Sequence, residues 1–476
     1  AVGDSDASGS TESVEETTSA SDGGQDAQVH DVSKAVHGAQ AAASGEFALS
    51  RVPASSRYSW ASMSLENFSL CGCISTVLIG AQLGHGLQLD QAIWATLIGA
   101  GILAAIGTLL GTIGCREGLT TSMLGRWTGL GCAGTAVLSL MIALSLMGWF
   151  GIQSAIAGKG LENLFKGLPD WGWTAISGLV VTVISMLGFR WMVAVAFVSG
   201  PAFLVVIVWA CVQSLSCPPT KLPPEQEATL ASPQLHLIDG VGLVVGGWIV
   251  GAVVSADIFR FSRSGCAVAS QVLLARTPSL VLYSLAGALV AHTYHTADII
   301  HIMHESVGWA AVVVVVAGEL VVNCANLYMT GLAVVSFCDV MLGCNVARSV
   351  VTLVCGIVGA VLGAAGILSH FINFLSILSV TFPPVAGIVS CEYFVVRAFS
   401  GSLDDTRRAE DVPKEACMWV PAALVAWVAA ALLGYFVPWG LPSLYSFFGA
   451  AVLYALAGGT GALRSFGSLQ TAGQPR

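Results

Sequence analysis

Apolar residues along this chain gather into twelve long stretches separated by short polar segments. Each stretch is close to the ~20 residues that an α-helix needs to cross a bilayer. The predicted spans are 63–83, 91–114, 132–157, 171–189, 191–215, 237–258, 277–298, 309–337, 346–366, 369–396, 416–437 and 441–463. The pattern therefore predicts an all-α membrane protein with twelve transmembrane helices, and a lipid bilayer as its surroundings, over residues 58–465.

The two ends of the chain lack this apolar pattern. Residues 1–57 are rich in Ser, Thr, Asp, Glu, Gly and Ala, a composition that predicts a disordered tail. Residues 466–476 form a short C-terminal tail. Placing the N-terminal tail in the cytoplasm puts all 19 Lys and Arg residues except Lys159, Lys166 and Lys221 on that side. We therefore expect both termini in the cytoplasm, and the plasma membrane as the location.

Glycines interrupt two of the spans. Span one contains Gly72 between Cys71 and Cys73, and span six contains Gly246-Gly247-Trp248. Interruptions at matching places in two halves of a chain indicate an inverted repeat with a binding site near the bilayer midplane. Since the two interruptions lie five spans apart, we expect a five-plus-five repeat followed by two extra helices. The alternative is that these glycines serve helix packing only.

The composition excludes several classes of protein. The chain is 55% apolar and 10% charged, whereas soluble domains carry about a quarter charged residues. The net charge of −9 owes much to the N-terminal tail, and no basic patch indicates a nucleic-acid partner. The 13 cysteines are scattered without a paired C-x-x-C framework for a metal. Enzyme motifs are absent, so we expect no catalytic activity and no cofactor.

One pair of residues in span three is unusual for a membrane helix. Trp149 and Gln153 lie one helical turn apart on one face. A polar amide unpaired in hydrocarbon costs several kcal/mol, so this face should point into the bundle. There the indole can stack on a flat solute while the amide reads its edge. The alternative is a packing tryptophan beside a glutamine bonded across helices.

Other polar and aromatic groups could line the same cavity. Trp248 follows Gly247 at the suspected break, and Asn323 and Asn326 come from span eight. Two indoles can hold a planar ring between them, and amides supply both donors and acceptors. We expect a flat, neutral, hydrogen-bonding solute. A sugar phosphate is excluded by the expectation that no Arg or Lys lies at this depth.

Acidic residues inside the spans fall into two groups. Glu319 lies seven residues before Asn326, hence on nearly the same face, and an intramembrane carboxyl is a candidate for proton coupling. A protonated structural glutamate is the alternative. Glu66, Asp257 and Glu392 lie near cytoplasmic helix ends, where capping or gating pairs with Arg are expected.

Four spaced motifs resemble the nucleobase:cation symporter-1 family, in particular its cytosine and purine-cytosine permeases. They are Gly118-Leu119-Thr120-Thr121 with Leu124 and Arg126, Gly148-Trp149-Phe150-Gly151, Ser255-Ala256-Asp257-Ile258-Phe259-Arg260-Phe261, and Pro383-Pro384-x2-Gly387 followed by Glu392-Tyr393. The resemblance covers roughly residues 60–460. It implies a leucine-transporter-type fold that works by alternating access.

The resemblance also implies roles for the candidate residues. Trp149 and Trp248 match the family's stacking aromatics, and Gln153 its substrate-binding amide. Asn326 matches the family's helix-eight asparagine, with Asn323 beside it. These residues, with Gly247 offering its carbonyl at the break, form the expected substrate site.

One departure from the family concerns the coupling cation. Sodium-coupled members carry hydroxyl residues just before the helix-eight asparagines, where this chain has Val321 and Val322. Valine offers no oxygen ligand to a hard cation, so H⁺ is favoured over Na⁺. We therefore expect a symporter that imports a nucleobase. Two alternatives remain open: the same fold carrying hydantoin, allantoin or a pyridine-type vitamin, and a non-transporting membrane receptor.

Overall fold

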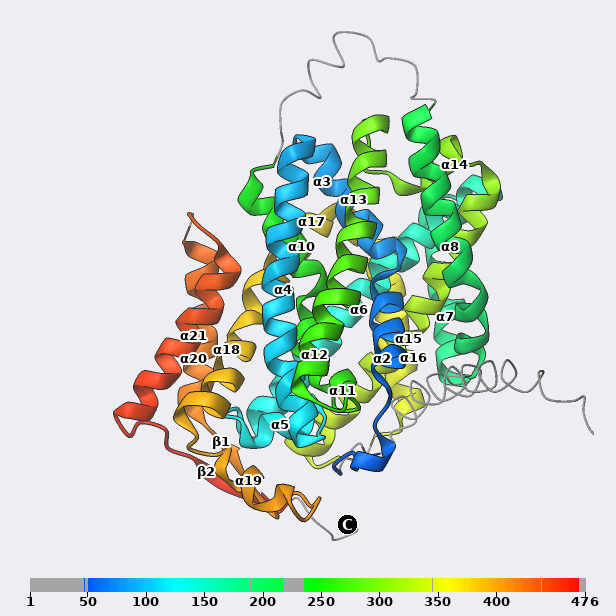
Figure 1. The fold of residues 1–476 in the computed structure, drawn as a ribbon. Coiled ribbons are helices and arrows are strands. Elements are labelled where there is room, and N and C mark those ends of the chain that lie inside the picture. The colour runs from blue at the N-terminus through cyan, green and yellow to red at the C-terminus, as the bar shows by residue number, and fades with distance from the viewer. Residues whose placement is uncertain are drawn as a thin grey trace, which may run out of the picture.

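The computed structural model describes residues 47, 50–187, 190–216, 235–344, 346–437 and 439–470, and helices dominate it (Figure 1). The first half contains η1 (Ala54–Ser56), α2 (Trp60–Cys71), α3 (Ile74–Gly86), α4 (Leu89–Glu117), α5 (Thr121–Trp127), α6 (Gly131–Leu164), α7 (Asp170–Leu187) and α8 (Arg190–Ser216). The second half contains α10 (Leu237–Val253), α11 (Ser255–Phe259), α12 (Gly265–Gln271), η2 (Val272–Arg276), α13 (Thr277–Tyr294), α14 (Ile299–Ser306), α15 (Trp309–Leu342) and α16 (Arg348–Ala364). The C-terminal part contains η3 (Ile367–His370), α17 (Phe371–Thr381), α18 (Pro383–Cys391), η4 (Glu392–Val396), α19 (Gly401–Arg407), β1 (Glu415–Trp419), α20 (Pro421–Phe436), α21 (Pro442–Gly459) and β2 (Phe466–Gln470).

Each of the twelve predicted spans overlaps one or more of these helices. Among the described residues, five helical stretches are long and apolar enough to cross a membrane, and the bent pair α2 and α3 makes a sixth. Shorter apolar helices cover Pro201–Ser216, Leu237–Val253, Arg348–Ala364 and Pro421–Phe436. The predicted helical membrane architecture is therefore confirmed. Most of the predicted N-terminal tail lies outside the described residues.

Span one is broken where its glycine predicted an interruption. α2 ends at Cys71 and α3 begins at Ile74, with a bend of 51° between them. The Thr76 hydroxyl donates to the Cys71 carbonyl at 2.7 Å, which satisfies a backbone group that the break would leave unpaired. A side chain on Gly72 would lie 3.0 Å from the Tyr283 hydroxyl, so the break is closely packed against α13.

The predicted position of the break in span six is wrong. α10 runs without interruption through Gly246, Gly247 and Trp248, and the helix breaks at Val254 instead. The two glycines have a packing role, because a side chain on Gly246 would overlap the Leu375 carbonyl and one on Gly247 would overlap Ile79. Gly247 therefore presents no broken-helix carbonyl in this structure.

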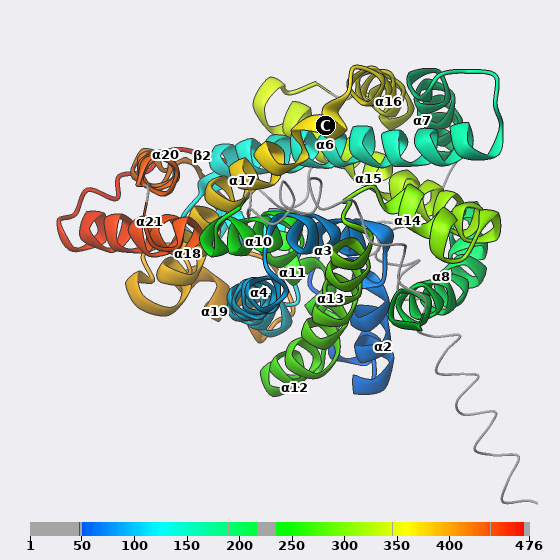
Figure 2. The ribbon, with the colours of Figure 1, turned by 90° about the horizontal axis from the view of Figure 1, so that it is seen from above.

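The helices pack in two groups, and the two broken helices belong to one of them. In one group α6, α7, α15 and α16 contact each other, and Figure 2 shows α6 crossing beside α15, α16 and α7. In the other group α3, α4, α10 and α13 pack together. α17 joins the groups, because it contacts both α10 and α6. The two broken helices belong to the second group and face the first across the molecule's centre.

A two-stranded antiparallel sheet lies at one end of the bundle, and the apolar pattern did not predict it. β1 pairs with β2, with Glu415 opposite Gln470 and Trp419 opposite Phe466. The predicted eleventh span therefore starts as a strand, and its helix begins only at Pro421. The first five residues of the predicted C-terminal tail form the partner strand.

Ordered structure begins before the predicted end of the N-terminal tail. Arg51 is 6% exposed, and its guanidinium donates to the carbonyl oxygens of Glu117 at 2.6 Å and Asp411 at 2.6 Å. The prediction that disorder extends to residue 57 is therefore wrong for residues 51–57. A composition-based argument misses this segment because a single buried arginine fixes it.

Candidate substrate site

A chain of three polar side chains crosses between the helix groups beside the break in span one. The Gln153 amide nitrogen donates to the Ser75 hydroxyl at 2.8 Å. The Asn326 amide nitrogen donates to the Gln153 amide oxygen at 2.9 Å. Ser75 is the second residue of α3, so the chain joins the start of α3 to α6 and α15. The structure thus brings Gln153 and Asn326 together as expected, and it adds Ser75.

The sequence analysis did not identify Ser75 as a site residue. A serine that begins the second half of a broken helix is a signal that could have identified it, since such half-helix ends line binding sites. Ser75 and Gln153 are both nearly fully buried, whereas Asn326 is half-buried. The donor and acceptor groups therefore lie at the packed interface of the two helix groups.

Asn323 holds α15 against α6. Its amide nitrogen donates to the Ser154 hydroxyl at 2.9 Å and to the Phe150 carbonyl at 3.2 Å. Its amide oxygen is buried and has no hydrogen-bond partner in the described part of the chain. Asn323 is one turn of α15 away from Asn326, and its partners on α6 flank Gln153 in the sequence. The structure places it as a bridge between helices next to the polar chain.

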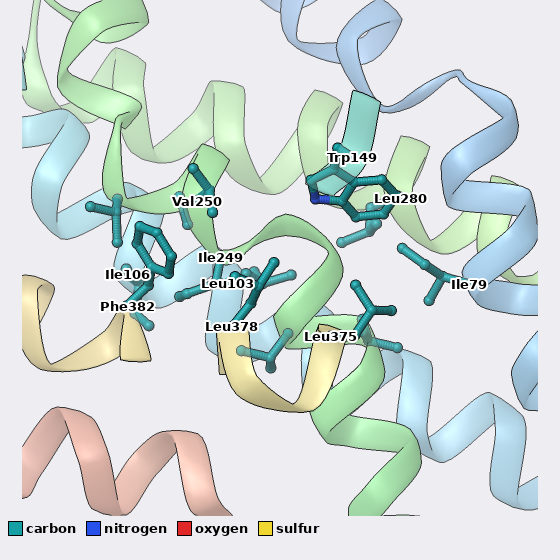
Figure 3. Packing of buried hydrophobic residues seen from close by; sticks show 14 of the residues in the cluster. Ile79, Leu103, Ile106, Trp149, Ile249, Val250, Leu280, Leu375, Leu378 and Phe382 are labelled. Atoms are coloured by element: carbon teal, nitrogen blue, oxygen red, sulfur yellow. The ribbon is translucent and has the colours of Figure 1, made fainter. Parts of the chain in front are cut away.

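Trp149 is buried against span ten. Its indole lies edge-to-face with Phe371 at 5.7 Å and with Phe374 at 5.8 Å between ring centroids. Figure 3 shows the ring facing the same interior region as Ile79 of α3 and Leu375 of α17. Such T-shaped contacts fix the orientation of the ring. Trp149 therefore lies one turn from Gln153 with a fixed orientation.

Trp248 lies on α10 and does not contact Trp149 ring to ring in the described chain. Its indole is half-buried, and its Nε1 is buried without a hydrogen-bond acceptor among the described residues. It lines a small cavity together with Cys71, Leu103 and Arg276. The two predicted stacking aromatics come from different helix groups, and the cavity that Trp248 lines does not include Trp149, Gln153 or Asn326.

Glu319 lies deep in α15, 1% exposed. Neither of its carboxyl oxygens has a hydrogen-bond partner in the described part of the chain. Glu319 is therefore a buried carboxyl without a hydrogen-bond partner in the described part of α15 and its surroundings.

A vestibule extends toward the polar chain from the end of the molecule opposite the sheet and stops short of it. It has a volume of about 420 Å³ and is lined on its inner side by Leu78, Gln82, Ala155 and Ile156. Ile156 is three residues from Gln153, and Leu78 is three residues from Ser75, so the vestibule ends about one helical turn from both. Lys159 and Asp298 form an ion pair at its wall, with 3.2 Å between Nζ and Oδ2.

A buried ion cluster at the sheet end of the bundle was not predicted. Glu117, at the end of α4, is fully buried and forms ion pairs with Arg51 at 2.7 Å and with Arg407. The Tyr393 hydroxyl also donates to its carboxylate. The cluster joins the N-terminal segment, α4 and α19. No sequence motif connects these residues, because their separation along the chain is large.

We predict that this cluster carries much of the stability of the sheet end. Replacing Glu117 with Gln leaves two arginines facing a neutral amide, and removing one partner of a buried pair costs about 3–5 kcal/mol. Purified Glu117→Gln should therefore melt several degrees below wild type. The control is Lys159→Met, which breaks an ion pair between half-exposed side chains worth at most about 1 kcal/mol. Equal melting temperatures for the two variants would contradict the prediction.

Two of the acidic residues expected at helix ends have capping roles. Asp257 accepts the Thr121 N–H at 2.7 Å at the start of α5. Glu392 accepts the N–H groups of Phe399 at 2.5 Å and Ser400 at 2.9 Å, and the Tyr454 hydroxyl at 3.1 Å. Both carboxylates cap backbone N–H groups, but the expected pairs with Arg are wrong, because none of the salt bridges among the described residues involves Asp257 or Glu392.

Known proteins share this architecture. Residues 52–461 match the family model described as permease for cytosine/purines, uracil, thiamine and allantoin. The chain belongs to this permease family. The permease is 26% identical to the cytosine permease of Escherichia coli (strain K12) over 417 residues, which are 86% of this chain and 93% of that protein. It is 23% identical to the hydantoin permease of Microbacterium maritypicum over 402 residues, which are 78% of this chain and 80% of that protein.

The fold of the permease is that of Mhp1, a transporter of the nucleobase-cation-symport-1 family. The inward-facing Mhp1 structure matches with a TM-score of 0.70 at 21% identity, covering 84% of this chain and 90% of that one. A closed Mhp1 structure with bromovinylhydantoin bound matches with a TM-score of 0.68 at 19% identity, covering 87% and 94%. The predicted family and the leucine-transporter-type fold are confirmed. The permease is a multi-pass membrane transporter and not an enzyme.

Proposed function

We propose that this permease imports a planar, neutral heterocycle of the nucleobase type by symport with a proton. The observation that carries the proposal is the chain from Ser75 through Gln153 to Asn326, one helical turn from the buried face of Trp149. An indole supplies a stacking surface, and two amides with a hydroxyl supply donors and acceptors at its edge. The names of two relatives, a cytosine permease and a hydantoin permease, refer to small planar rings with hydrogen-bonding edges.

The same polar chain explains how the permease could discriminate between solutes by their hydrogen-bonding groups. Gln153 already uses one donor and its oxygen on protein partners, and Asn326 uses one donor. The second donor of each amide and the Asn326 oxygen are the groups that we propose meet a ring edge. A solute with a mismatched edge leaves a buried amide unpaired, which costs about 1–3 kcal/mol. The chain therefore favours one pattern of donors and acceptors over the others. Hydantoin or allantoin remains the nearest alternative substrate, because one relative is a hydantoin permease.

We predict that Gln153 and Asn326 set the order of preference among bases. Asn326→Ser should remove the donor to the Gln153 oxygen and free that oxygen for the solute. The ranking of cytosine, adenine, hypoxanthine and uracil as competitors of uptake should then change, with differences of about tenfold. Thr330→Ser, one turn further along α15, is the matched control, because its hydroxyl only bonds the Asn326 carbonyl at 2.8 Å. An unchanged ranking in both Asn326→Ser and Gln153→Asn would mean that the amides are structural.

A proton is the proposed coupling cation. Val321 and Val322 offer no side-chain oxygen to sodium, while Glu319 on the same helix is titratable and buried without a hydrogen-bond partner in the described chain. An ionised carboxylate in such a place is costly, so the protonated form suits this conformation. Opening toward water on one side would let the proton leave. Glu319 can therefore couple the release of a proton to the movement of the helix groups.

The ends of the described chain support an arrangement with both termini on one side of the membrane. Arg51 bonds the Asp411 backbone four residues before β1, and β2 pairs with β1. We propose that this side is the cytoplasm, because most Lys and Arg residues lie there, and that the membrane is the plasma membrane.

Binding to purified protein tests the substrate class without any assumption about coupling. We expect a panel of cytosine, uracil, adenine, hypoxanthine, hydantoin and allantoin to include at least one compound that raises the melting temperature in a concentration-dependent way, while the corresponding nucleosides do not. Stabilisation by nucleosides or by none of the panel would contradict the proposed substrate class.

A further inference from the structure

One arginine lies at the level of the helix breaks, where the sequence analysis expected no basic residue. Arg276 is 8% exposed and ends the π-helical turn η2. It is the twelfth residue of the 30-residue apolar helix Gly265–Tyr294, about 16 Å from its start. A π-helical turn inside an α-helix frequently marks a functional position. The expectation that no Arg or Lys lies at this depth is therefore wrong.

Arg276 has no carboxylate partner in the described part of the chain. None of the salt bridges found there involves it. An unpaired guanidinium in an apolar setting is costly, and its neighbours in the adjoining cavity include Ala100, Leu103 and Leu280. Something other than an acidic side chain must therefore offset its charge.

The C-terminal end of α2 lies on one side of the guanidinium. Arg276 and Cys71, the last residue of α2, line the same small cavity. One turn further along span seven, the Ser279 hydroxyl donates to the Phe68 carbonyl in the last turn of α2 at 2.6 Å. A helix C-terminus carries about half a negative charge. Span seven thus places the Arg276 guanidinium and the Ser279 hydroxyl beside the C-terminal end of α2.

The C-terminal end of α10 lies on the other side. An Arg276 Nη1 donates to the Ser255 hydroxyl at 3.1 Å, immediately after the break at Val254. The Ser255 hydroxyl in turn donates to the Gly251 carbonyl at 3.1 Å, in the last turn of α10. A side chain on Gly251 would lie 3.0 Å from Nη2 of Arg276, so glycine leaves room for the guanidinium there. The second helix end supplies a further half negative charge, and the two ends together balance one cation.

We propose that Arg276 is a resident cation of the transport site, holding the C-terminal ends of α2 and α10 together where a free metal cation could otherwise bind. Half-helix C-terminal ends at such breaks coordinate cations in transporters of this architecture. Arg276 is a positioning residue: it holds the ends of α2 and α10, which lie beside Ser75 at the start of α3 and after Trp248 in α10, and it does not touch the solute. Because Arg276 occupies this place permanently, the cation that drives transport must bind elsewhere, at a titratable group. Only the uptake measurement in the test below rests on the proposed transport function.

Chemical rescue tests this proposal. Arg276→Ala removes the guanidinium and leaves a space that free guanidinium ion can enter. We expect the variant to melt below wild type and to lose uptake of its base by about tenfold or more. Guanidinium chloride at about 10 mM should raise the melting temperature and restore uptake, since a ligand that binds only the folded state stabilises it. Urea at the same concentration has the same shape without charge and should do neither.

Two further variants keep the test decisive if Arg276→Ala does not fold. Arg276→Lys keeps a positive charge and should retain part of the uptake, whereas Arg276→Gln keeps a donor for Ser255 without the charge and should lose it. Arg263→Ala, an exposed arginine near the start of the same span, is the matched control. Equal behaviour of the Lys and Gln variants, or equal effects of guanidinium and urea, would overturn the proposal. If wild type takes up no base, the proposed function fails, and the melting comparison still decides the role of Arg276.

Discussion

Trp149→Ala should weaken binding of the transported base by at least about tenfold, because stacking of a base on an aromatic ring contributes about 1–3 kcal/mol. Phe371 and Phe374 pack against the indole in T-shaped contacts, so the ring is oriented before the solute arrives. Binding therefore loses little entropy in ordering this side chain. Equilibrium binding of radiolabelled base to purified variant and wild type measures the effect.

A loss of packing must be separated from a loss of stacking in this experiment. Removing a buried tryptophan can itself cost about 3–5 kcal/mol of stability, so each variant is first checked for folding by its melting curve. Trp149→Phe keeps an aromatic face and should bind with an intermediate affinity. Trp94→Ala removes an indole that is 59% exposed on α4 and should leave affinity unchanged. Wild-type affinity in a folded Trp149→Ala variant would refute the stacking role.

Glu319→Gln should abolish accumulation of the base against its gradient while leaving its binding nearly unchanged. Glutamine has the shape of the protonated glutamate but cannot release a proton. Both carboxyl oxygens lack hydrogen-bond partners in the described chain, so the substitution breaks no contact there. The variant should still exchange labelled base for unlabelled base across the membrane, because exchange needs no net proton movement.

Glu66→Gln is the matched control for this result. Glu66 is a half-buried carboxyl in the middle of α2, five residues before the last residue of that helix. Accumulation should persist in that variant. Undiminished accumulation by Glu319→Gln, or a parallel loss of binding and exchange, would remove Glu319 from the coupling step.

The sequence predicted the membrane helices and the break in span one because both depend on local composition. A run of about 20 apolar residues is sufficient to indicate a membrane helix, and a glycine between two cysteines weakens a helix at one point. Trp149, Gln153 and Asn326 were found for a similar reason. Polar and aromatic side chains on one face of an apolar helix need a partner inside the bundle, and the structure shows Gln153 bonded to Asn326.

The features that sequence reasoning missed depend on contacts between distant segments. Gly246 and Gly247 read as a break but serve close packing against Leu375 and Ile79, which only the neighbouring helices reveal. In the sequence, Glu117 follows the second predicted span and Arg51 lies in the predicted tail, and nothing local indicates that they meet. In the structure they form a buried ion pair. Arg276 was counted with the cytoplasmic basic residues, because nothing local shows that two helix ends converge on it.

Uptake by proteoliposomes with imposed gradients tests the central claim most directly. Purified permease in sealed vesicles is given a labelled base under an inward proton gradient, an inward sodium gradient, or neither, with choline replacing sodium. The account predicts accumulation of a nucleobase-type ring with the proton gradient alone, abolished by a protonophore and indifferent to sodium. Accumulation that requires sodium and saturates with its concentration would contradict proton coupling, and failure of every base to accumulate under either gradient would contradict the proposed function itself.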